Sequence, residues 1–273
     1  MKILIACDME GLPGVVDWDH VSNKHPEYER YRKIMTASLN AAVRGAFDGG
    51  ASQVLIADGH ANGRNLLLEE LDSRAYLNSG PDFPYGMVKG IETGVQAVMY
   101  VGYHARAGTV NAALCHTWSG NIGNVWLNGT LVGEIGLNAA VCGHFSTPVI
   151  LISGDQSACA EAVELLGPVE TAIVKRAYSH FGAECLPLAD AYQLISTAAQ
   201  RAVTRLKAGN IPGPFRPTSP ITLTVELNGV DKADQAQILP GARRLDSRRL
   251  EYTAEDIILA YRAFQTIAAL ARI

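Results

Sequence analysis

The chain has 273 residues, of which 48% are hydrophobic and 18% charged, and its formal net charge at pH 7 is -4. This composition is typical of a globular protein with a sizeable core, and it excludes the basic surface of a nucleic-acid-binding protein. No stretch reaches the roughly 20 apolar residues of a membrane span, and the apolar start is too short for a signal peptide, so we expect neither nucleic acid nor membrane among its partners.

Apolar strands and helices alternate along most of the chain. The long helix over 27–50 is predicted from apolar residues at helical spacing and from the glycine pair that ends it. A hairpin over 125–133 is predicted from Asn128-Gly129, which suits a two-residue turn with positive φ. The other expected elements are strand 2–7, strand 53–59, short helix 65–71, strand 95–104, helix 134–145, strand 148–153, helix 157–166, strand 171–178 and helix 189–209.

A proline-rich segment over 209–220 holds four prolines in 12 residues and is the best candidate boundary. It divides the chain into an α/β domain over 1–209 and a small α+β part over 210–273. In the second part we expect strands at 221–227 and near 248–254 and a terminal helix over 254–272. About 60 residues is marginal for an independent domain, so this part is expected to pack on the main body.

The alternation of apolar strands with helices also predicts the fold class. We expect an α/β protein with a largely parallel central sheet that helices cover on both faces. Sheets of this kind place their ligand sites at the carboxyl ends of the strands. The residues that follow each predicted strand are therefore the first candidates for function.

Acids and histidines follow three of the predicted strands. Asp8 and Glu10 end the first strand and share a face if it continues, because side chains alternate along a strand. His60 follows the second strand, and His104 follows the third. Two neighbouring carboxylates repel each other unless a proton or a cation neutralises them, and oxygen with imidazole ligands suits zinc or another first-row divalent metal.

Two further candidates lie beyond these strands. Glu134 opens an otherwise apolar helix, and His116 stands in the stretch NAALCHTW. Each candidate alone has an ordinary structural explanation: Glu134 favours the positive end of its helix, and Asp58 fixes a turn or orients His60. The prediction of a metal site therefore depends on the coincidence of several such groups at strand ends.

A nucleophilic centre has less support. Cys115 and His116 are adjacent, so in an extended segment their side chains point to opposite faces. The sequence contains no GxSxG elbow, and GLPG is not a GxGxxG loop. The polar residues before the helix over 157–166 are interpreted as its N-cap, with Ser153, Asp155 or Ser157 as the capping residue.

The five cysteines are odd in number and include no Cys-x-x-Cys pair. A fully paired disulfide framework is therefore not expected. The simplest interpretation is a protein with reduced thiols in the cytoplasm.

Several motifs resemble the D-aminopeptidase family, peptidase family M55, and they run nearly from end to end of the chain. GYHARA at 102–107 and VGEIGLNA at 132–139 are the most specific. The others are DMEG at 8–11, YER and IMT within 28–36, GH at 59–60 and LPG at 239–241.

The resemblance implies a metallo-aminopeptidase that removes N-terminal D-amino acids, such as D-Ala, from short peptides. It implies hydrolysis by a metal-activated water, a catalytic role for His116, and a homo-oligomer in the form of a decameric ring. The D preference follows from the resemblance alone, because the pocket walls that set stereochemistry cannot be placed from the sequence.

The resemblance also implies a centre of two zinc ions per subunit in the 1–209 domain, although other divalent metals fit the same donors. In this arrangement Asp8 bridges the two ions. Glu10 and His60 complete one site, and His104 and Glu134 complete the other.

Three other interpretations stay open. The first is a metal-dependent hydrolase of another amide or of a phosphoester, since two-metal sites serve both kinds of chemistry. The second is a non-catalytic metal-binding or assembly protein. The third is a metal-free globular subunit in which the polar strand ends are only solvated.

Overall fold

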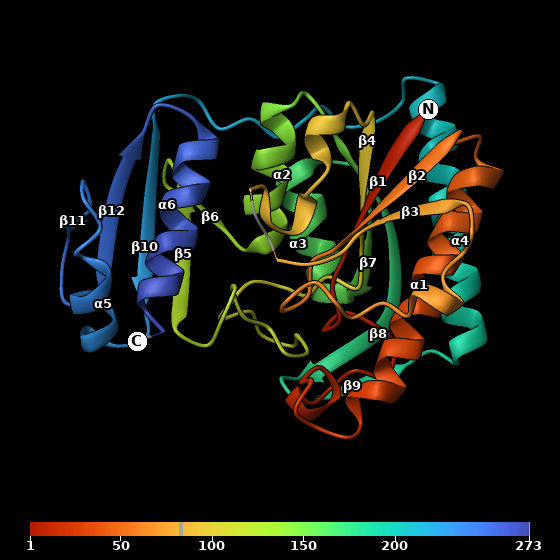
Figure 1. Cartoon of the computed structure of the whole chain (residues 1–273), viewed down its shortest axis with the longest axis horizontal. Helices are drawn as coiled ribbons and strands as arrows, with labels where there is room; N and C mark the ends of the chain where they lie inside the picture. The colour runs from red at the N-terminus through yellow and green to blue at the C-terminus, as the bar shows by residue number, and fades with distance from the viewer. Residues whose placement is uncertain (82–83, 273) are drawn as a thin grey trace.

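The computed structural model describes residues 1–81 and 84–272, and it builds them into two sheets with helices packed around them (Figure 1). The larger sheet has the strand order β3-β2-β1-β4-β7-β8-β9, and the smaller has the order β11-β12-β10-β5-β6. The strands of the larger sheet are β1 (Lys2–Cys7), β2 (Gln53–Asp58), β3 (Ala75–Asn78), β4 (Ala97–Val101), β7 (Val149–Asp155), β8 (Glu170–Ser179) and β9 (Gly182–Cys185).

The larger sheet is parallel except for β9, which pairs antiparallel with β8. Its central strands are apolar and buried on both sides, as expected when helices cover both faces. Figure 1 shows α1 (Tyr28–Asp48) and α4 (Leu188–Lys207) on one face and α2 (Glu134–His144) and α3 (Gln156–Leu166) on the other. The predicted α/β fold with a largely parallel, doubly covered sheet is confirmed.

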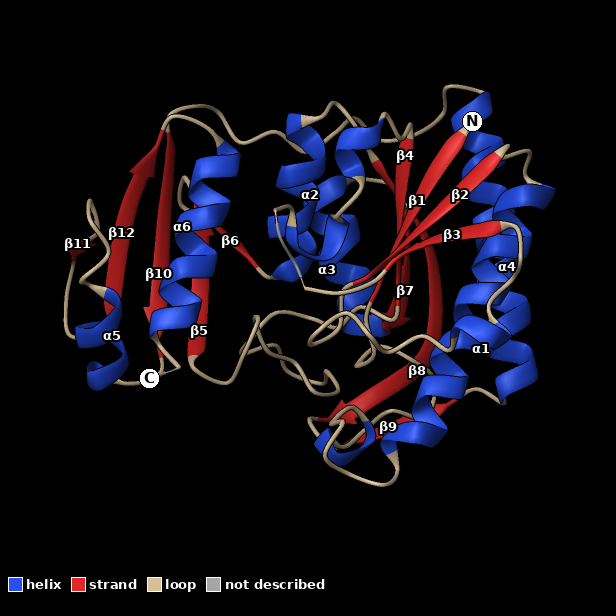
Figure 2. Cartoon of the chain, in the orientation of Figure 1, coloured by secondary structure: helices blue, strands red, loops and turns tan. Residues whose placement is uncertain are grey.

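The smaller sheet is antiparallel and has one covered face. Its strands are β5 (Ile122–Leu127), β6 (Thr130–Val132), β10 (Ile221–Leu227), β11 (Arg243–Arg244) and β12 (Arg249–Ala254). In β10 every second residue is buried, the alternation of a strand with one covered face. The remaining helices are α5 (Val230–Ala236) and α6 (Ile257–Leu270), and Figure 2 shows α6 between this sheet and α2.

The smaller sheet draws on residues from both sides of the predicted boundary. β5 and β6 come from the middle of the chain, whereas β10, β11 and β12 follow the proline-rich segment. Apolar side chains of α2, α6 and both sets of strands belong to one buried cluster. The C-terminal part therefore packs on the main body, while the division at residues 209 and 210 stays a prediction.

Most predicted elements lie where the sequence placed them, and the differences are local. The helix expected over 65–71 shrinks to the 3-10 turn η2 (Leu68–Glu70), and the strand expected over 95–104 ends at Val101 because Gly102 turns the backbone with a φ of 79°. Short elements without a clear period were not predicted, namely β3, β9, β11, α5 and the 3-10 turns η1 (Trp18–His20), η3 (Gly86–Val88) and η4 (Ile91–Thr93). Among the described residues, no helix combines the length and apolar character needed to span a membrane.

Candidate metal centre

The carboxyl ends of three adjacent parallel strands meet at one edge of the larger sheet. β1 lies between β2 and β4, and Cys7 at its end pairs with Asp58 on one side and with Val101 on the other. The side chains that follow these three ends are therefore brought together. Helix α2 and the loop before β5 add one acid and one histidine to the same place, so the structure places all six predicted residues around one centre: Asp8, Glu10, His60, His104, His116 and Glu134.

Two glycines let the loops after β1 and β4 approach closely. Gly11 N donates to Gly102 O at 2.8 Å. A Cβ on Gly11 would lie 1.9 Å from Tyr103 O, and one on Gly102 would lie 2.2 Å from Asp8 O. Any larger residue would push the two loops apart, so these glycines set the distance between Asp8 and His104.

His60 faces both acids of the first loop. Its Nδ1 lies 3.1 Å from Asp8 Oδ1 and 3.2 Å from Glu10 Oε2. Its Nε2 donates to the carbonyl oxygen of Val21 at 2.9 Å. In the neutral ring Nδ1 then carries a lone pair, and three electron-rich atoms face one another. Such a group requires a proton or a cation between its members.

His104 repeats this arrangement on the other side of Asp8. Its Nδ1 donates to Ala105 O at 2.9 Å, which turns Nε2 toward two acids. Nε2 lies 3.2 Å from Glu134 Oε1 and 3.4 Å from Asp8 Oδ2. Asp8 therefore presents one oxygen to each histidine.

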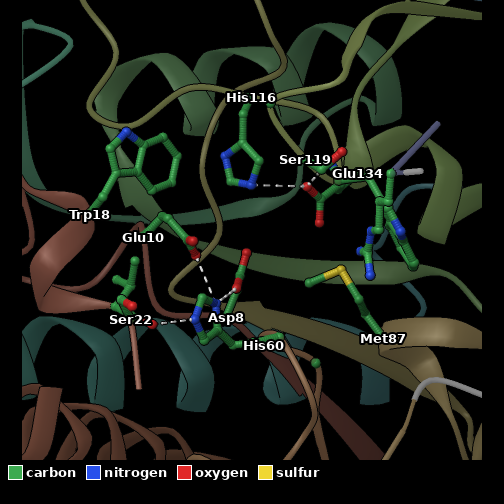
Figure 3. Close-up of a pocket in the computed structure, with 15 residues that line it drawn as sticks. Asp8, Glu10, Trp18, Ser22, His60, Met87, His116, Ser119 and Glu134 are labelled. Carbon is green, nitrogen blue, oxygen red and sulfur yellow. Dashed lines mark hydrogen bonds and ion pairs between the residues drawn. The ribbon is translucent and has the colours of Figure 1, made fainter. Parts of the chain in front are cut away.

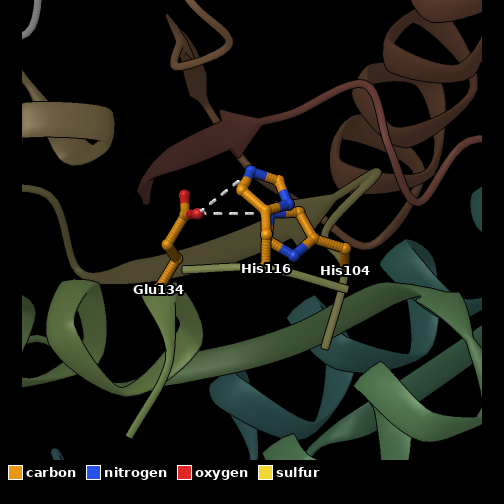
Figure 4. A group of neighbouring side chains, drawn as sticks. All are labelled: His104, His116 and Glu134. Atoms are coloured by element: carbon orange, nitrogen blue, oxygen red, sulfur yellow. Dashed lines mark ion pairs between the residues drawn. The ribbon is translucent and has the colours of Figure 1, made fainter. Parts of the chain in front are cut away.

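His116 lies beside this second half of the centre (Figure 4). Its ring stacks on that of His104 with centroids 4.0 Å apart. Nδ1 donates to Leu114 O at 2.9 Å, and Nε2 lies 3.7 Å from Glu134 Oε1. The side chain of His116 is 16% exposed, against 1% for His104, so His116 is the histidine of this pair that reaches solvent.

The donors at this edge fit a divalent cation. Glu10 Oε2 and His104 Nε2 are buried and have no hydrogen-bond partner among the described residues. Two groups of side chains each bring three ligand atoms within 4.8 Å of one another. One group is His104, His116 and Glu134, and the other is Asp8, Glu10 and His104. Buried carboxylate and imidazole donors at this spacing suit zinc.

Burial and mutual charge shift the pKa values of this centre. Burial, with a contribution from the charge of Glu10, raises the pKa of Asp8 to about 7. Burial lowers the pKa of His60 and of His104, but the surrounding carboxylates outweigh it and hold both pKa values well above the ordinary one. The metal-free centre therefore keeps protons where a cation would bind, and a bound cation must displace them.

The pKa of His116 moves in the opposite direction. Burial lowers it first, and the positive charge of His104 lowers it further. His116 therefore favours the neutral form, which accepts a proton.

A cavity of about 520 Å³ opens onto this centre. Figure 3 shows the side chains of Glu10, His60, His116 and Glu134 around it. Its volume lies within the range of about 300–1,000 Å³ that is usual for small-ligand sites. The other residues that line it are Asp8, Trp18, Val21, Ser22, Gly59, Ala61, Met87, Trp118, Ser119, Gly120 and Arg272.

Lys175 is a functional candidate that the sequence reasoning missed. Its ammonium group is buried behind the centre, where Nζ donates to the carbonyl oxygens of Glu10 and Val15, each at 2.5 Å. Burial lowers the pKa of Lys175 to about 8. The available signal was a single lysine within the apolar strand TAIVKRAY, whose neighbours gave no indication of a partner 165 residues away.

Two buried aspartates hold the loops that carry the histidines. Asp58 accepts from Asn65 N at 2.6 Å, and Asn65 Nδ2 donates to His60 O at 2.7 Å, so Asp58 fixes the turn, as one of its predicted roles required. Asp155 is the N-cap of α3, and it also accepts from Ala113 N at 2.8 Å in the loop of His116. Asp58 and Asp155 therefore fix the loops of His60 and His116 without belonging to the centre themselves.

Cys115 and His116 diverge, as their adjacency predicted. Cys115 Sγ lies 3.5 Å from His180 Nδ1, whereas His116 Nε2 lies on the side of Glu134. Burial raises the pKa of the Cys115 thiol. The two neighbours therefore form no thiol–imidazole dyad.

Comparisons with known proteins point to one family. The family model for D-aminopeptidase, peptidase family M55, matches residues 1–266. A D-aminopeptidase of Bacillus subtilis (strain 168) is 33% identical over 272 residues, which cover 99% of this chain and 98% of the relative. The solved structure of the Zn-dependent D-aminopeptidase DppA from Bacillus subtilis, a self-compartmentalizing protease, matches with a TM-score of 0.96 and 33% identity over 100% of this chain and 98% of that one.

Proposed function

The chain belongs to the D-aminopeptidase family of metallopeptidases, and we propose that it is a zinc-dependent aminopeptidase that removes N-terminal D-amino acids, such as D-Ala, from short peptides. One observation carries the proposal. Histidine nitrogens and buried carboxylates face one another along a cavity of about 520 Å³, a volume usual for small-ligand sites. Both the sequence comparison and the structure comparison match nearly the whole chain to a D-aminopeptidase of Bacillus subtilis.

We propose that five side chains hold two zinc ions, with Asp8 shared between them. Glu10 and His60 serve one ion, and His104 and Glu134 serve the other. The two oxygens of Asp8, which face different histidines, support this division. Other first-row divalent metals suit the same donors. Zinc held there would lower the pKa of a bound water to about 7 and would polarise the carbonyl group of the scissile bond.

We assign His116 the transfer of a proton. Its Nδ1 hydrogen is engaged by Leu114 O, so the neutral ring has a lone pair on Nε2. Nε2 accepts a proton as water attacks the carbonyl carbon and then donates it to the nitrogen of the leaving amine. The lowered pKa of His116 supports this role, because the base must begin the reaction neutral.

The proposed activity is tested with matched peptides and controlled zinc. Purified protein is assayed on D-Ala and L-Ala dipeptides of otherwise equal sequence, and on a generic aryl phosphate, before zinc removal, after it and after zinc is added back. We expect hydrolysis of the D-Ala peptide that disappears with zinc and returns with it. Faster cleavage of the L-Ala peptide or of the phosphate, or full activity in verified zinc-free protein, would contradict the proposal.

We also propose that the chain works as a homo-oligomer in the cytoplasm. The relative DppA is a self-compartmentalizing protease, and the family resemblance implies a ring of ten subunits. The five free cysteines agree with a reducing compartment. Light scattering of the purified protein should give a mass near ten chains, and a monomer mass would contradict the ring.

A further inference from the structure

The metal cavity draws its wall from two distant parts of the chain. The acids and histidines lie at the edge of the larger sheet, whereas Arg272 lies two residues after the end of the C-terminal helix α6. Arg272 N donates to Ala269 O at 3.2 Å, so the backbone continues the last turn of the helix. Trp118, another lining residue, packs edge-on against Tyr261 and Phe264 of α6, with ring centroids 6.2 and 5.5 Å apart. Helix α6 therefore packs against this wall of the cavity.

Arg272 brings a permanent positive charge to the cavity. The other ionisable side chains along the cavity are carboxylates and imidazoles, so among the described lining residues Arg272 carries the one guanidinium or ammonium group. Its guanidinium makes no ion pair with any residue that the structure describes. Four other arginines of the C-terminal part do have carboxylate partners, and these pairs are Arg243 with Glu251, Arg244 with Asp234, Arg248 with Glu226, and Arg249 with Asp246.

A short peptide has the complementary chemistry. Its N-terminal residue must reach the acids and histidines, where the first peptide bond is cut. Its C-terminal carboxylate then lies only one or two residues away, at about 3.5 Å per residue in an extended chain. A guanidinium binds a carboxylate through two parallel N–H···O bonds, a geometry that an ammonium group cannot match.

We propose that Arg272 binds the free C-terminal carboxylate of the peptide substrate. Arg272 thereby selects dipeptides and tripeptides with a free acid over longer or amidated peptides. This inference rests on the proposed aminopeptidase function and adds a determinant of substrate length to it. It also gives the C-terminal part of the chain a task at the active site, although Arg272 lies beyond the range that the family model matches.

The test uses a D-Ala dipeptide as the free acid and as the C-terminal amide. Wild type, Arg272→Gln, Arg272→Lys and Arg262→Gln are compared at saturating zinc, with zinc content measured for each. Arg262 is the matched control, because it is an exposed arginine of α6 that does not line the cavity. The readout is the ratio of kcat/KM for the acid to kcat/KM for the amide.

We expect wild type and Arg262→Gln to favour the acid by about 10- to 100-fold, the range expected for hydrogen bonds to a charged group. Arg272→Gln should bring the ratio close to one, mainly through KM, and Arg272→Lys should retain part of the preference. Zinc content should be equal in all four proteins.

Two results overturn the inference while leaving the aminopeptidase function intact. One is wild-type cleavage of the acid and the amide at equal rates. The other is an acid-to-amide ratio in Arg272→Gln that equals the wild-type ratio. Absence of cleavage of either D-Ala peptide by zinc-loaded wild type would instead contradict the proposed function itself.

Discussion

Asp8 and His60 are 52 residues apart in the chain, yet Oδ1 of one lies 3.1 Å from Nδ1 of the other. The other ring nitrogen of His60, Nε2, donates its hydrogen to Val21 O. In the neutral ring the two facing atoms, Asp8 Oδ1 and His60 Nδ1, are therefore both electron-rich. Positive charge must lie between them, and the second oxygen of Asp8 repeats the relationship with His104. The proposed zinc centre depends on this pair of contacts.

Asp8→Asn should abolish most zinc binding, because the substitution removes the negative charge shared by both halves of the centre. Loss of a supporting residue outside a metal site costs about 10- to 100-fold in affinity, so loss of a shared ligand should exceed about 100-fold. Zinc per chain is measured after dialysis, with circular dichroism to verify folding. The exposed Glu69→Gln variant serves as the charge-matched control. Full zinc content in folded Asp8→Asn would contradict the assignment of Asp8.

Zinc affinity should rise with pH between 6 and 8. Burial and the charge of Glu10 raise the pKa of Asp8 to about 7, and the pKa values of His60 and His104 are held well above normal against the effect of burial. These groups carry protons in the metal-free protein and release them to zinc, so the metal competes better as the proton concentration falls. Calorimetry in buffers of different ionisation enthalpy counts the released protons. Affinity that is constant over this range, with no proton release, would contradict the prediction.

His116→Ala should lower kcat by about 10²- to 10⁴-fold, the usual contribution of a general acid–base group. Zinc content should persist, because the five proposed ligands remain. Activity and bound zinc are measured on the same sample. Parallel loss of both would show that His116 is a ligand, which its place in one of the two metal-sized clusters also permits.

Lys175 lies behind the centre, and Lys175→Met should weaken zinc binding although Lys175 is not a proposed ligand. The variant leaves two buried carbonyl oxygens, those of Glu10 and Val15, without the donor that holds them. We expect about 1–3 kcal/mol less stability and about 10- to 100-fold weaker zinc binding. Thermal unfolding of the metal-free protein and chelator competition measure the two effects separately. Arg176→Met, an exposed neighbour on β8, is the control, and zinc affinity equal to wild type in Lys175→Met would overturn the role.

Three residues of the centre could be predicted from the sequence because ligand sites of parallel sheets lie at the carboxyl ends of the strands. Asp8, His60 and His104 each follow an apolar strand, and parallel strands bring their carboxyl ends to one edge. The alternation of apolar strands with helices predicted the doubly covered sheet. Glu134 and His116 needed the family resemblance as well, because a helix start and a loop have no fixed position relative to that edge.

Other features could not be read from the sequence because distant contacts decide them. Lys175 meets Glu10 only after β8 has taken its place in the sheet. The pairing of β5 with β10 across the proline-rich segment has no local signal, since each strand alone is only an alternating apolar run. Arg272 resembles any exposed terminal arginine until α6 packs against the cavity wall.

The central claim is that five side chains hold two zinc ions, and anomalous diffraction at the zinc absorption edge tests it most directly. The account predicts two peaks in a crystal of the zinc-loaded protein, with Asp8 in contact with both. One peak should also contact Glu10 and His60, and the other His104 and Glu134. A single peak, or peaks that contact none of these five residues, would contradict the account.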